Sequence, residues 1–127
     1  MKTFTFKYSP NEPSIATRLQ EAVDGKPHVR PDELVCTSLK ALLQVASESR
    51  LALFEIILKQ KPSSIYDLAE KAKLSQPYVL KEVRVLEGFG LIKLVHEKDG
   101  GRERLRPEAL YSKIIIDCGF GDAKEAS

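Results

Sequence analysis

Residues 64–92, SIYDLAEKAKLSQPYVLKEVRVLEGFGLI, contain the pattern that decides the fold. Ser64 and Ser75 each stand where the N-cap of a helix is expected, because each precedes a segment with apolar residues at helical spacing. The apolar stripe of the first segment is Ile65, Leu68, Ala69 and Ala72, and that of the second is Val79, Val83 and Leu86. The pattern therefore predicts a helix, a tight turn and a second helix over residues 75–88.

The second helix is predicted to pack by one face and to show cations on the other. At about 100° per residue its apolar positions fall in one narrow sector, and Lys81 and Arg84 lie on the opposite side. Glu82 and Glu87 are expected to flank this cationic face and to dilute its charge. A short helix with these two faces meets the requirements of a recognition helix that enters the major groove of DNA.

Residues 91–106 indicate a two-stranded wing after this helix. The helix is expected to stop at Gly88-Phe89-Gly90, because glycine permits the positive φ with which many helices end. The expected elements are a strand at residues 91–96, a turn at Asp99-Gly100-Gly101 and a returning strand at residues 102–106. Pro107 is expected to end the pairing, because proline cannot donate a hydrogen bond to a neighbouring strand.

Alternation along the returning strand places Arg102, Arg104 and Arg106 on one face. A row of arginines can follow phosphates or place a side chain in the minor groove. Charges on a hairpin edge also protect against aggregation, and the sequence favours neither interpretation over the other.

The rest of the chain predicts short elements on either side of this region. They are a strand at Phe4–Tyr8, a helix at residues 15–23, a linker at 26–31, a brief strand at Leu34–Thr37, a helix capped by Ser38 and a strand within Tyr111–Cys118. We therefore expect an α+β protein, mainly α with a small β-sheet. Residues 1–37 would form a strand–helix extension, 38–118 a winged helix-turn-helix domain and 119–127 a frayed tail.

The helix predicted between Ser47 and Pro62 is apolar around more than half its circumference. Its apolar residues are Leu51, Ala52, Leu53, Phe54, Ile56, Ile57 and Leu58. One helix-turn-helix cannot cover so wide an apolar surface. The pattern favours a homodimer, with the N-terminal elements of the same chain as the alternative cover.

Composition sets broad limits on the class of protein. The chain has 127 residues, of which 43% are hydrophobic and 30% charged, as in ordinary soluble proteins. A net charge of +2 permits nucleic-acid binding without indicating it. No apolar run approaches the ~20 residues that span a bilayer and the start lacks a signal-peptide core, so a cytoplasmic location is expected. Cys36 and Cys118 are expected to be reduced and buried, with oxidation sensing as the alternative.

The sequence contains no pattern typical of catalysis, a cofactor or a metal ion. His28 and His96 have no carboxylate at a telling spacing and are interpreted as solvated or structural. The chain has no phosphate-binding loop, nucleophile elbow or zinc-binding histidine pair. We therefore expect a protein that is not an enzyme and that binds no metal or cofactor, and the sequence identifies no small-molecule effector.

Two strings resemble a known superfamily. LSQPYVLKEVRVLEGFGLI, together with the upstream SRLALFEIILKQKPSSIYDLAEKAKL, is similar to the winged-helix transcriptional regulators of the MarR-like and ArsR-like superfamily. Within it the chain looks most like a group of short prokaryotic predicted regulators that also end with an isoleucine-rich strand such as YSKIIID. The resemblance implies a homodimer on pseudo-palindromic double-stranded DNA. It also implies contacts from Ser75, Gln76, Tyr78, Lys81 and Arg84 of the helix and from Arg102 and Arg104 of the wing.

The residues themselves suggest the chemistry of these contacts. Gln76 and Tyr78 near the start of the helix can reach base edges, and Lys81 and Arg84 can reach bases or phosphates. Ser63 and Ser64 begin the preceding helix, where hydroxyls and free amides favour a phosphate. The leading hypothesis is a sequence-specific DNA-binding regulator. The alternative is a winged-helix protein-interaction module, antitoxin-like or part of a transcription complex, without specific DNA readout.

Overall fold

The computed structural model of the chain describes residues 2–10 and 32–119. The helix predicted over residues 15–23, the linker over 26–31 and the tail from residue 120 lie outside the described residues. The described residues form two compact units. We call Lys2 with Glu48–Ser112 the helical unit, and the described residues of 3–47 and 113–119 the strand unit.

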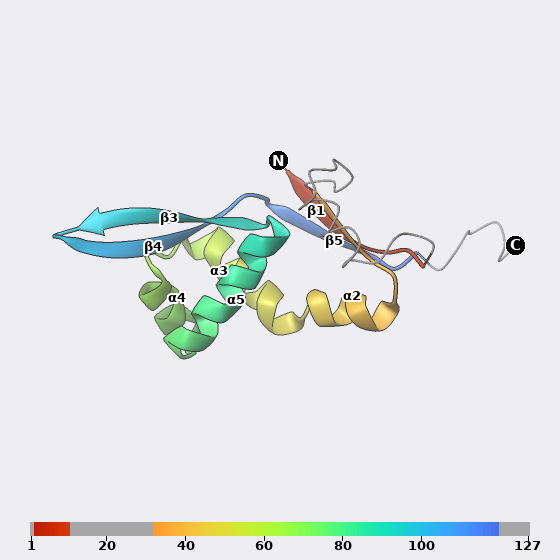
Figure 1. The fold of residues 1–127 in the computed structure, drawn as a ribbon, viewed down its shortest axis with the longest axis horizontal. Coiled ribbons are helices and arrows are strands. Elements are labelled where there is room, and N and C mark those ends of the chain that lie inside the picture. The colour runs from red at the N-terminus through yellow and green to blue at the C-terminus, as the bar shows by residue number, and fades with distance from the viewer. Residues whose placement is uncertain (1, 11–31, 120–127) are drawn as a thin grey trace, which may run out of the picture. The chain divides into compact units, whose positions relative to one another are not determined.

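The helical unit packs three helices against a β-hairpin (Figure 1). Its elements are α3 (Glu48–Gln60), α4 (Ile65–Ala72), α5 (Gln76–Phe89), β3 (Ile92–Asp99) and β4 (Arg102–Ala109). The predicted stripes are confirmed at their centres, since Leu68, Val79, Val83 and Leu86 are buried, although Ile65 and Ala72 are only half-buried. Burial of each large apolar side chain contributes on the order of 1.5–3 kcal/mol.

The helix ends are where the sequence predicts them. The Ser64 Oγ accepts a hydrogen bond from the Asp67 amide at 3.0 Å, and the Ser75 Oγ accepts one from the Tyr78 amide at 3.4 Å. Gly90 ends α5 with a φ of 87°, in the left-handed region that glycine adopts without strain. Local sequence therefore fixes the boundaries of both helices.

The hairpin is longer than predicted. Only Gly100 and Gly101 form the turn, and both have positive φ, as a two-residue turn of the primed type requires. The prediction that Pro107 ends the pairing is wrong, because Pro107 is buried within β4 opposite Leu94. Each strand of a two-stranded ribbon has one unpaired edge, so proline is tolerated where its nitrogen faces that edge.

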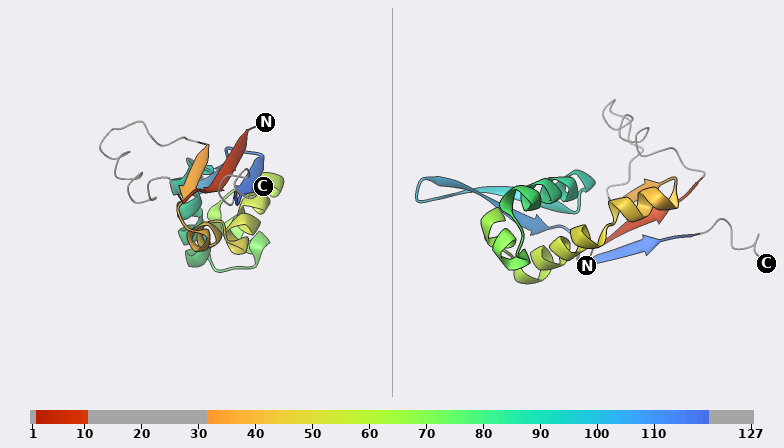
Figure 2. Two further views of the ribbon diagram at one scale, coloured as in Figure 1. Left: turned by 90° about the vertical axis from the view of Figure 1, so that its right-hand side faces the viewer. Right: turned by 90° about the horizontal axis from the view of Figure 1, so that it is seen from below.

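The strand unit contains a three-stranded parallel sheet. Its elements are β1 (Thr3–Tyr8), β2 (Glu33–Cys36), α2 (Leu39–Val45) and β5 (Lys113–Asp117), and the strand order is β2-β1-β5 (Figure 2). The helix α2 contacts β1 and β2, and its predicted cap is confirmed by the bond from the Ala41 amide to the Ser38 Oγ. Phe4 and Phe6 are buried, with ring centroids 5.1 Å apart. The N-terminal strand thus pairs within its own chain.

The structure bears on two sequence-based interpretations, the domain boundaries and the cover of α3. The sequence places α2 and β5 in the domain of residues 38–118, whereas both lie in the strand unit. The chain by itself already buries Leu53, Phe54 and Ile57 of α3. The chain thus covers part of the apolar surface of α3, while Leu51, Ile56 and Leu58 stay half-buried.

The two cysteines flank β1 from opposite sides of the sheet. Cys36 is the register partner of Tyr8, and Asp117, which precedes Cys118, is the register partner of Lys7. Two strand spacings amount to about 10 Å, more than the roughly 7 Å that a disulfide can bridge. Cys36 is buried, which raises the pKa of its thiol, whereas Cys118 is half-exposed, so the prediction that both are buried is wrong for Cys118.

Candidate nucleic-acid interface

A groove of about 1150 Å³ opens where the starts of α4 and α5 meet β4. Five of the nine residues predicted to contact DNA line it, namely Ser63, Ser64, Gln76, Arg102 and Arg104. They come from three segments that are up to about forty residues apart in the chain. The fold therefore brings hydroxyl, amide and guanidinium groups together in one groove. From the sequence, this proximity followed only if residues 91–106 formed a wing.

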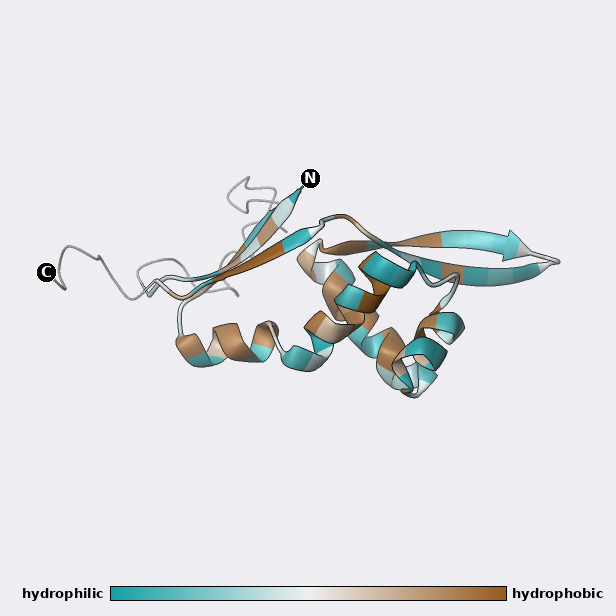
Figure 3. Ribbon diagram, turned by 180° about the vertical axis from the view of Figure 1, so that it is seen from behind, coloured by the Kyte–Doolittle hydropathy of each residue, from teal (hydrophilic) through white to brown (hydrophobic). Residues whose placement is uncertain are grey.

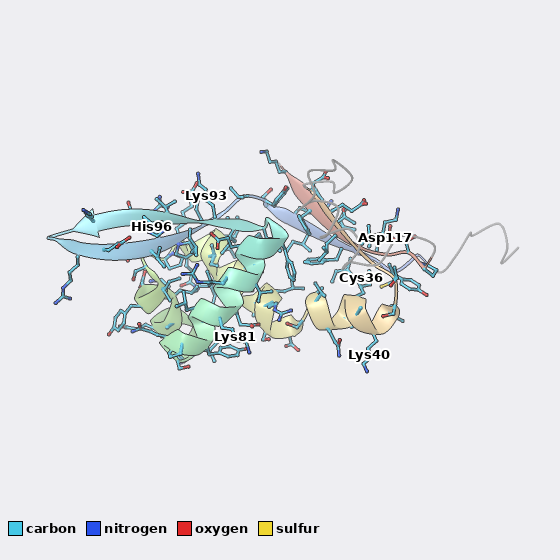
Figure 4. The ribbon with its side chains drawn as sticks, viewed as in Figure 1. Cys36, Lys40, Lys81, Lys93, His96 and Asp117 are labelled. Atoms are coloured by element: carbon cyan, nitrogen blue, oxygen red, sulfur yellow. The ribbon has the colours of Figure 1, made fainter. Side chains whose placement is uncertain are left out.

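The other four predicted residues, Ser75, Tyr78, Lys81 and Arg84, do not line the groove but are exposed on and beside α5. Lys81 projects from the outer face of the helix (Figure 4). No ion pair engages Lys81 within residues 2–10 and 32–119, and Arg84 approaches only Glu87, with Nη1 and Oε1 3.9 Å apart. The outer face of α5 thus presents two cations with little compensation from neighbouring carboxylates.

The expectation that two glutamates dilute this face is wrong for Glu82, whereas Glu87 does lie beside Arg84. Only 5% of Glu82 is exposed, and its Oε1 accepts a hydrogen bond from the Arg50 Nε at 3.0 Å. The Arg50 guanidinium also lies 6.0 Å from the centroid of the Phe89 ring. A buried carboxylate is tolerated when it is paired and hydrogen-bonded. Glu82 therefore joins α5 to α3 and holds the helix in place.

The start of α4 already holds an anion of its own. The Asp67 carboxylate accepts hydrogen bonds from the Ser63 amide at 2.8 Å and from the Lys71 Nζ at 2.7 Å, and the Ser63 hydroxyl lies 3.3 Å away. The bond from Lys71, and then that from the Ser63 amide, lower the pKa of Asp67. A phosphate at this helix end would compete with Asp67 for the amide and the hydroxyl of Ser63, so the Ser64 hydroxyl, which accepts a bond from the Asp67 amide, is better suited to donate to one.

The amides at the start of α5 are also largely engaged. Pro77 has no N–H, and the amides of Tyr78 and Val79 bond to the side chain and the carbonyl of Ser75. The first turn of α5 contains no acidic residue, which leaves the positive end of its dipole uncompensated by a local carboxylate. The contribution of this end to an anion is therefore mainly electrostatic.

The strand register places the three arginines of β4 on one face of the hairpin, as the alternation predicts. Arg106 is committed to the hairpin itself, because its Nε lies 3.0 Å from Glu97 Oε1 and its Nη1 lies 3.1 Å from Glu108 Oε2. These bonds, that with Glu97 first, raise the pKa of Arg106. Arg102 has no ion pair within the described ranges, so the end of the row near the turn is the better candidate for a phosphate contact.

The far end of the hairpin is polar on both faces. Its outer half is hydrophilic, while the half next to the helices is hydrophobic (Figure 3). His96 Nδ1 lies 2.9 Å from Glu103 Oε1 on the face opposite the arginines, and both side chains are exposed. This pair partly engages the one carboxylate of β4 that lines the groove.

Sequence reasoning missed Tyr66. Its side chain lines the groove, it is 59% exposed, and a hydrogen bond with Glu70 raises the pKa of its hydroxyl. Tyr66 falls on the solvent side of α4, where the apolar periodicity carries no information about function. The one sequence signal is an aromatic residue outside the apolar stripe of α4.

Across residues 2–10 and 32–119, no group of three or more His, Cys, Asp or Glu side chains is placed to hold a metal ion. None of the helices in the described ranges combines the length and the apolarity that crossing a membrane requires.

Comparison with known proteins gives a family but no activity. A family model described as HVO_A0114 matches residues 45–116, more than half of the chain, and the match covers α3, α4, α5, the hairpin and most of β5. No curated protein and no solved structure matches the chain. The family model does not extend the sequence resemblance to a named class of regulators. The chain belongs to the HVO_A0114 family.

Proposed function

We propose that the helical unit is a winged helix-turn-helix that binds double-stranded DNA, as part of a homodimeric transcriptional regulator acting in the cytoplasm. The observation that carries the proposal is the division of α5 into two faces. One face is buried through Val79, Val83 and Leu86, and the other presents Lys81 and Arg84 to solvent.

The dimensions of α5 suit the major groove. Its 14 residues extend over about 21 Å, and a helix with side chains is about 10–12 Å wide, close to the ~12 Å width of the groove in B-DNA. Gln76 and Tyr78 would contact base edges, and Lys81 and Arg84 would contact bases or phosphates. Because Glu82 is turned inward, no carboxylate stands between these two cations on the outer face.

The groove between the helix starts and β4 is the proposed site of the DNA backbone. Arg102 and Arg104 would contact phosphates, and the hydroxyls of Ser63 and Ser64 would donate hydrogen bonds. Ser75 would act mainly as the cap that fixes the start of α5. In this arrangement the helix supplies specificity and the hairpin supplies affinity that does not depend on sequence.

The test is a titration of random-sequence duplex DNA with the protein at several salt concentrations, with fluorescence anisotropy as the measure of binding. If Lys and Arg side chains contact phosphates, the logarithm of the affinity falls steeply and linearly with the logarithm of the salt concentration. Flat anisotropy at about 50 mM salt, where such proteins bind tightly, would contradict the proposal. A positive result justifies selection of a preferred sequence from a random pool.

A protein-interaction module is the second candidate, and one observation favours it. Three large apolar side chains of the helix-turn-helix are exposed, Tyr66 at 59%, Leu74 at 42% and Tyr78 at 38%. Aromatic residues of this kind often anchor protein interfaces. Under this alternative, association with another protein is insensitive to salt and duplex DNA is not bound.

A further inference from the structure

The outer edge of β5 has the features of a strand that pairs with another copy of itself. In the described part of the chain, β5 pairs only with β1, so its other edge has backbone groups without a neighbouring strand. An exposed strand edge is a template for further pairing unless charges, proline or a bulge protect it. Here the middle of the strand is Ile114-Ile115-Ile116, which no charge or proline interrupts (Figure 3).

Both faces of this strand have exposed apolar surface. Ile115 is 40% exposed and Ile116 is 42% exposed, and the two side chains point to opposite faces of the sheet because neighbours in a strand alternate. Exposed isoleucines on an edge strand promote association with other chains and therefore indicate an interaction surface. A partner that covers one face of the sheet would bury only one of these two side chains. A further strand paired to this edge would bury surface of both.

The sequence of β5 is complementary to itself when two copies run antiparallel. With Ile115 opposite Ile115 of a second copy, Ile114 falls opposite Ile116, and Lys113 falls opposite Asp117 at both ends. Opposite charges and apolar residues facing each other across strands are the pairs that stabilise a sheet. The arrangement has the two-fold symmetry of the commonest homodimers, in which the same patch contributes from both copies.

The two charged ends are available for such pairs. No ion pair engages Lys113 within residues 2–10 and 32–119, and the Asp117 Oδ1 bonds only to the Gly119 amide two residues later, at 3.0 Å. Asp117 lies at the end of the strand, near the end of β2 that carries Cys36 (Figure 4). The two residues are about 13 Å apart along their own strand, too far to neutralise each other.

We infer that two copies of the chain associate through antiparallel pairing of their β5 strands, centred on Ile115, into a continuous six-stranded sheet. The inference rests on the homodimer in the proposed function and gives that dimer its surface. It does not depend on DNA, because every group it uses lies in the strand unit. Sedimentation of the full chain without DNA therefore tests it separately from DNA binding.

The decisive experiment is a charge reversal, with the dimer dissociation constant measured by sedimentation. Lys113→Asp places two carboxylates opposite each other at both ends, and Asp117→Lys places two ammonium groups there. Each single reversal should raise the dissociation constant about tenfold or more. The double variant Lys113→Asp/Asp117→Lys restores opposite charges at both ends and should return it close to the wild-type value.

The double variant distinguishes the dimer contact from damage to the subunit. Asp117 is the register partner of Lys7 in β1, so a lysine at position 117 meets this cation within its own chain in both the single and the double variant. A misfolded subunit would not be rescued by the second reversal. A monomeric wild-type chain at about 100 μM, or a double variant as weak as its parents, overturns the inference.

The register has its own test, in a Cys118→Ser background that leaves only the buried Cys36. Ile115→Cys places two thiols opposite each other, at a spacing within the range a disulfide bridges, and should form covalent dimers on mild oxidation. Ile116→Cys is the matched control, since it is equally exposed but faces position 114 of the other copy. Equal cross-linking of both variants would also overturn the inference. Leu43 on α2 is 57% exposed and offers a competing surface, so dissociation by Leu43→Lys while β5 variants remain dimeric would overturn it too.

Discussion

The outer face of α5 and the arginine face of the hairpin both carry cations in the sequence, but in the structure these cations differ in how closely carboxylates pair with them. On α5, Lys81 has no ion pair within the described residues, and Arg84 only approaches Glu87 at 3.9 Å. On the hairpin, Arg106 is held by two carboxylates and Lys93 lies 3.5 Å from Glu108. From this difference we expect a cation to contribute to DNA binding only where its own chain leaves the charge uncompensated. The predictions below test that difference.

The largest effect on stability is expected at Arg50, whose guanidinium pairs with a buried carboxylate. Arg50→Ala leaves the carboxylate of Glu82 buried, with its side chain 7% exposed and its partner removed. We expect the free energy of unfolding to fall by about 2–4 kcal/mol, because an unpaired buried charge is strongly destabilising. Urea denaturation followed by circular dichroism measures this change.

Lys59→Ala is the matched control for Arg50→Ala. Lys59 also pairs with a glutamate, Glu55, at 2.9 Å, but their side chains are 69% and 61% exposed. Such a pair contributes only about 0.3–0.5 kcal/mol. Similar losses in the two variants would show that Glu82 is not the buried anchor of α5.

The next effect concerns the uncompensated cations of α5. Arg84→Ala should weaken binding of the preferred DNA sequence by about 1–3 kcal/mol and relax the preference at one base position, if Arg84 reads a base. Lys81→Ala should weaken binding by a similar amount if it reads a base, and less if it contacts a phosphate. Anisotropy titrations with the selected duplex and with single-position variants measure both quantities.

Lys59→Ala again serves as the control for α5, since it removes an exposed cation from a different helix and should leave the DNA affinity unchanged. An Arg84→Ala variant with wild-type affinity would remove this residue from the interface. A loss that is the same for every duplex would reassign Arg84 from base readout to phosphate contact.

The hairpin allows a comparison between Arg106, which two carboxylates hold, and Arg104, which lines the groove. Arg104→Ala should weaken binding of all sequences alike and reduce the salt slope by about 1. Arg106→Ala should leave that slope unchanged, because Glu97 and Glu108 already neutralise the charge. If both variants reduce the slope equally, the ion pairs of Arg106 do not persist on DNA and the comparison fails.

Local features of this fold were predictable from the sequence because their causes lie within a few residues. The Ser64 and Ser75 caps each bond to an amide three residues on, and Gly90 ends α5 through its own φ. The alternation that sets the arginine face is a property of any strand. The groove is not such a feature, because its five predicted residues come from three segments that only the fold brings together.

The rest depends on contacts between residues that are far apart in the chain. Arg50 and Glu82 are separated by 32 residues, so no periodicity shows that Glu82 turns inward. The pairing of β1 with β5 joins Thr3 to Lys113, and the parallel register is not encoded in either strand alone. Pro107 stays in β4 because a two-stranded ribbon leaves one edge unpaired, which the sequence of one strand cannot reveal.

The smallest predicted effect is at the start of α4, where a carboxylate rather than a cation is compensated. Hydrogen bonds from Lys71 and the Ser63 amide hold the pKa of Asp67 below its ordinary value of 3.8. The folded state binds this proton less readily than the unfolded chain, so the stabilisation is present at neutral pH and is lost as the pH falls below 3.8 and through the lower pKa of the folded state. Asp67→Asn should lower Tm by about 2 °C at pH 7, as expected for a half-exposed ion pair, and should not lower it at pH 2.

An NMR titration of the Asp67 carboxyl identifies the cause of this effect. In Lys71→Ala the largest contribution to the lowered pKa is removed, and the pKa should move up toward 3.8 while the bond from the Ser63 amide keeps it slightly below. A wild-type Asp67 that titrates at or above 3.8 would mean that the start of α4 is not occupied by its own anion. The positive end of α4 would then be open to a phosphate. In that case Ser63 and Ser64, and not only the arginines of the hairpin, would contribute to the affinity for the DNA backbone.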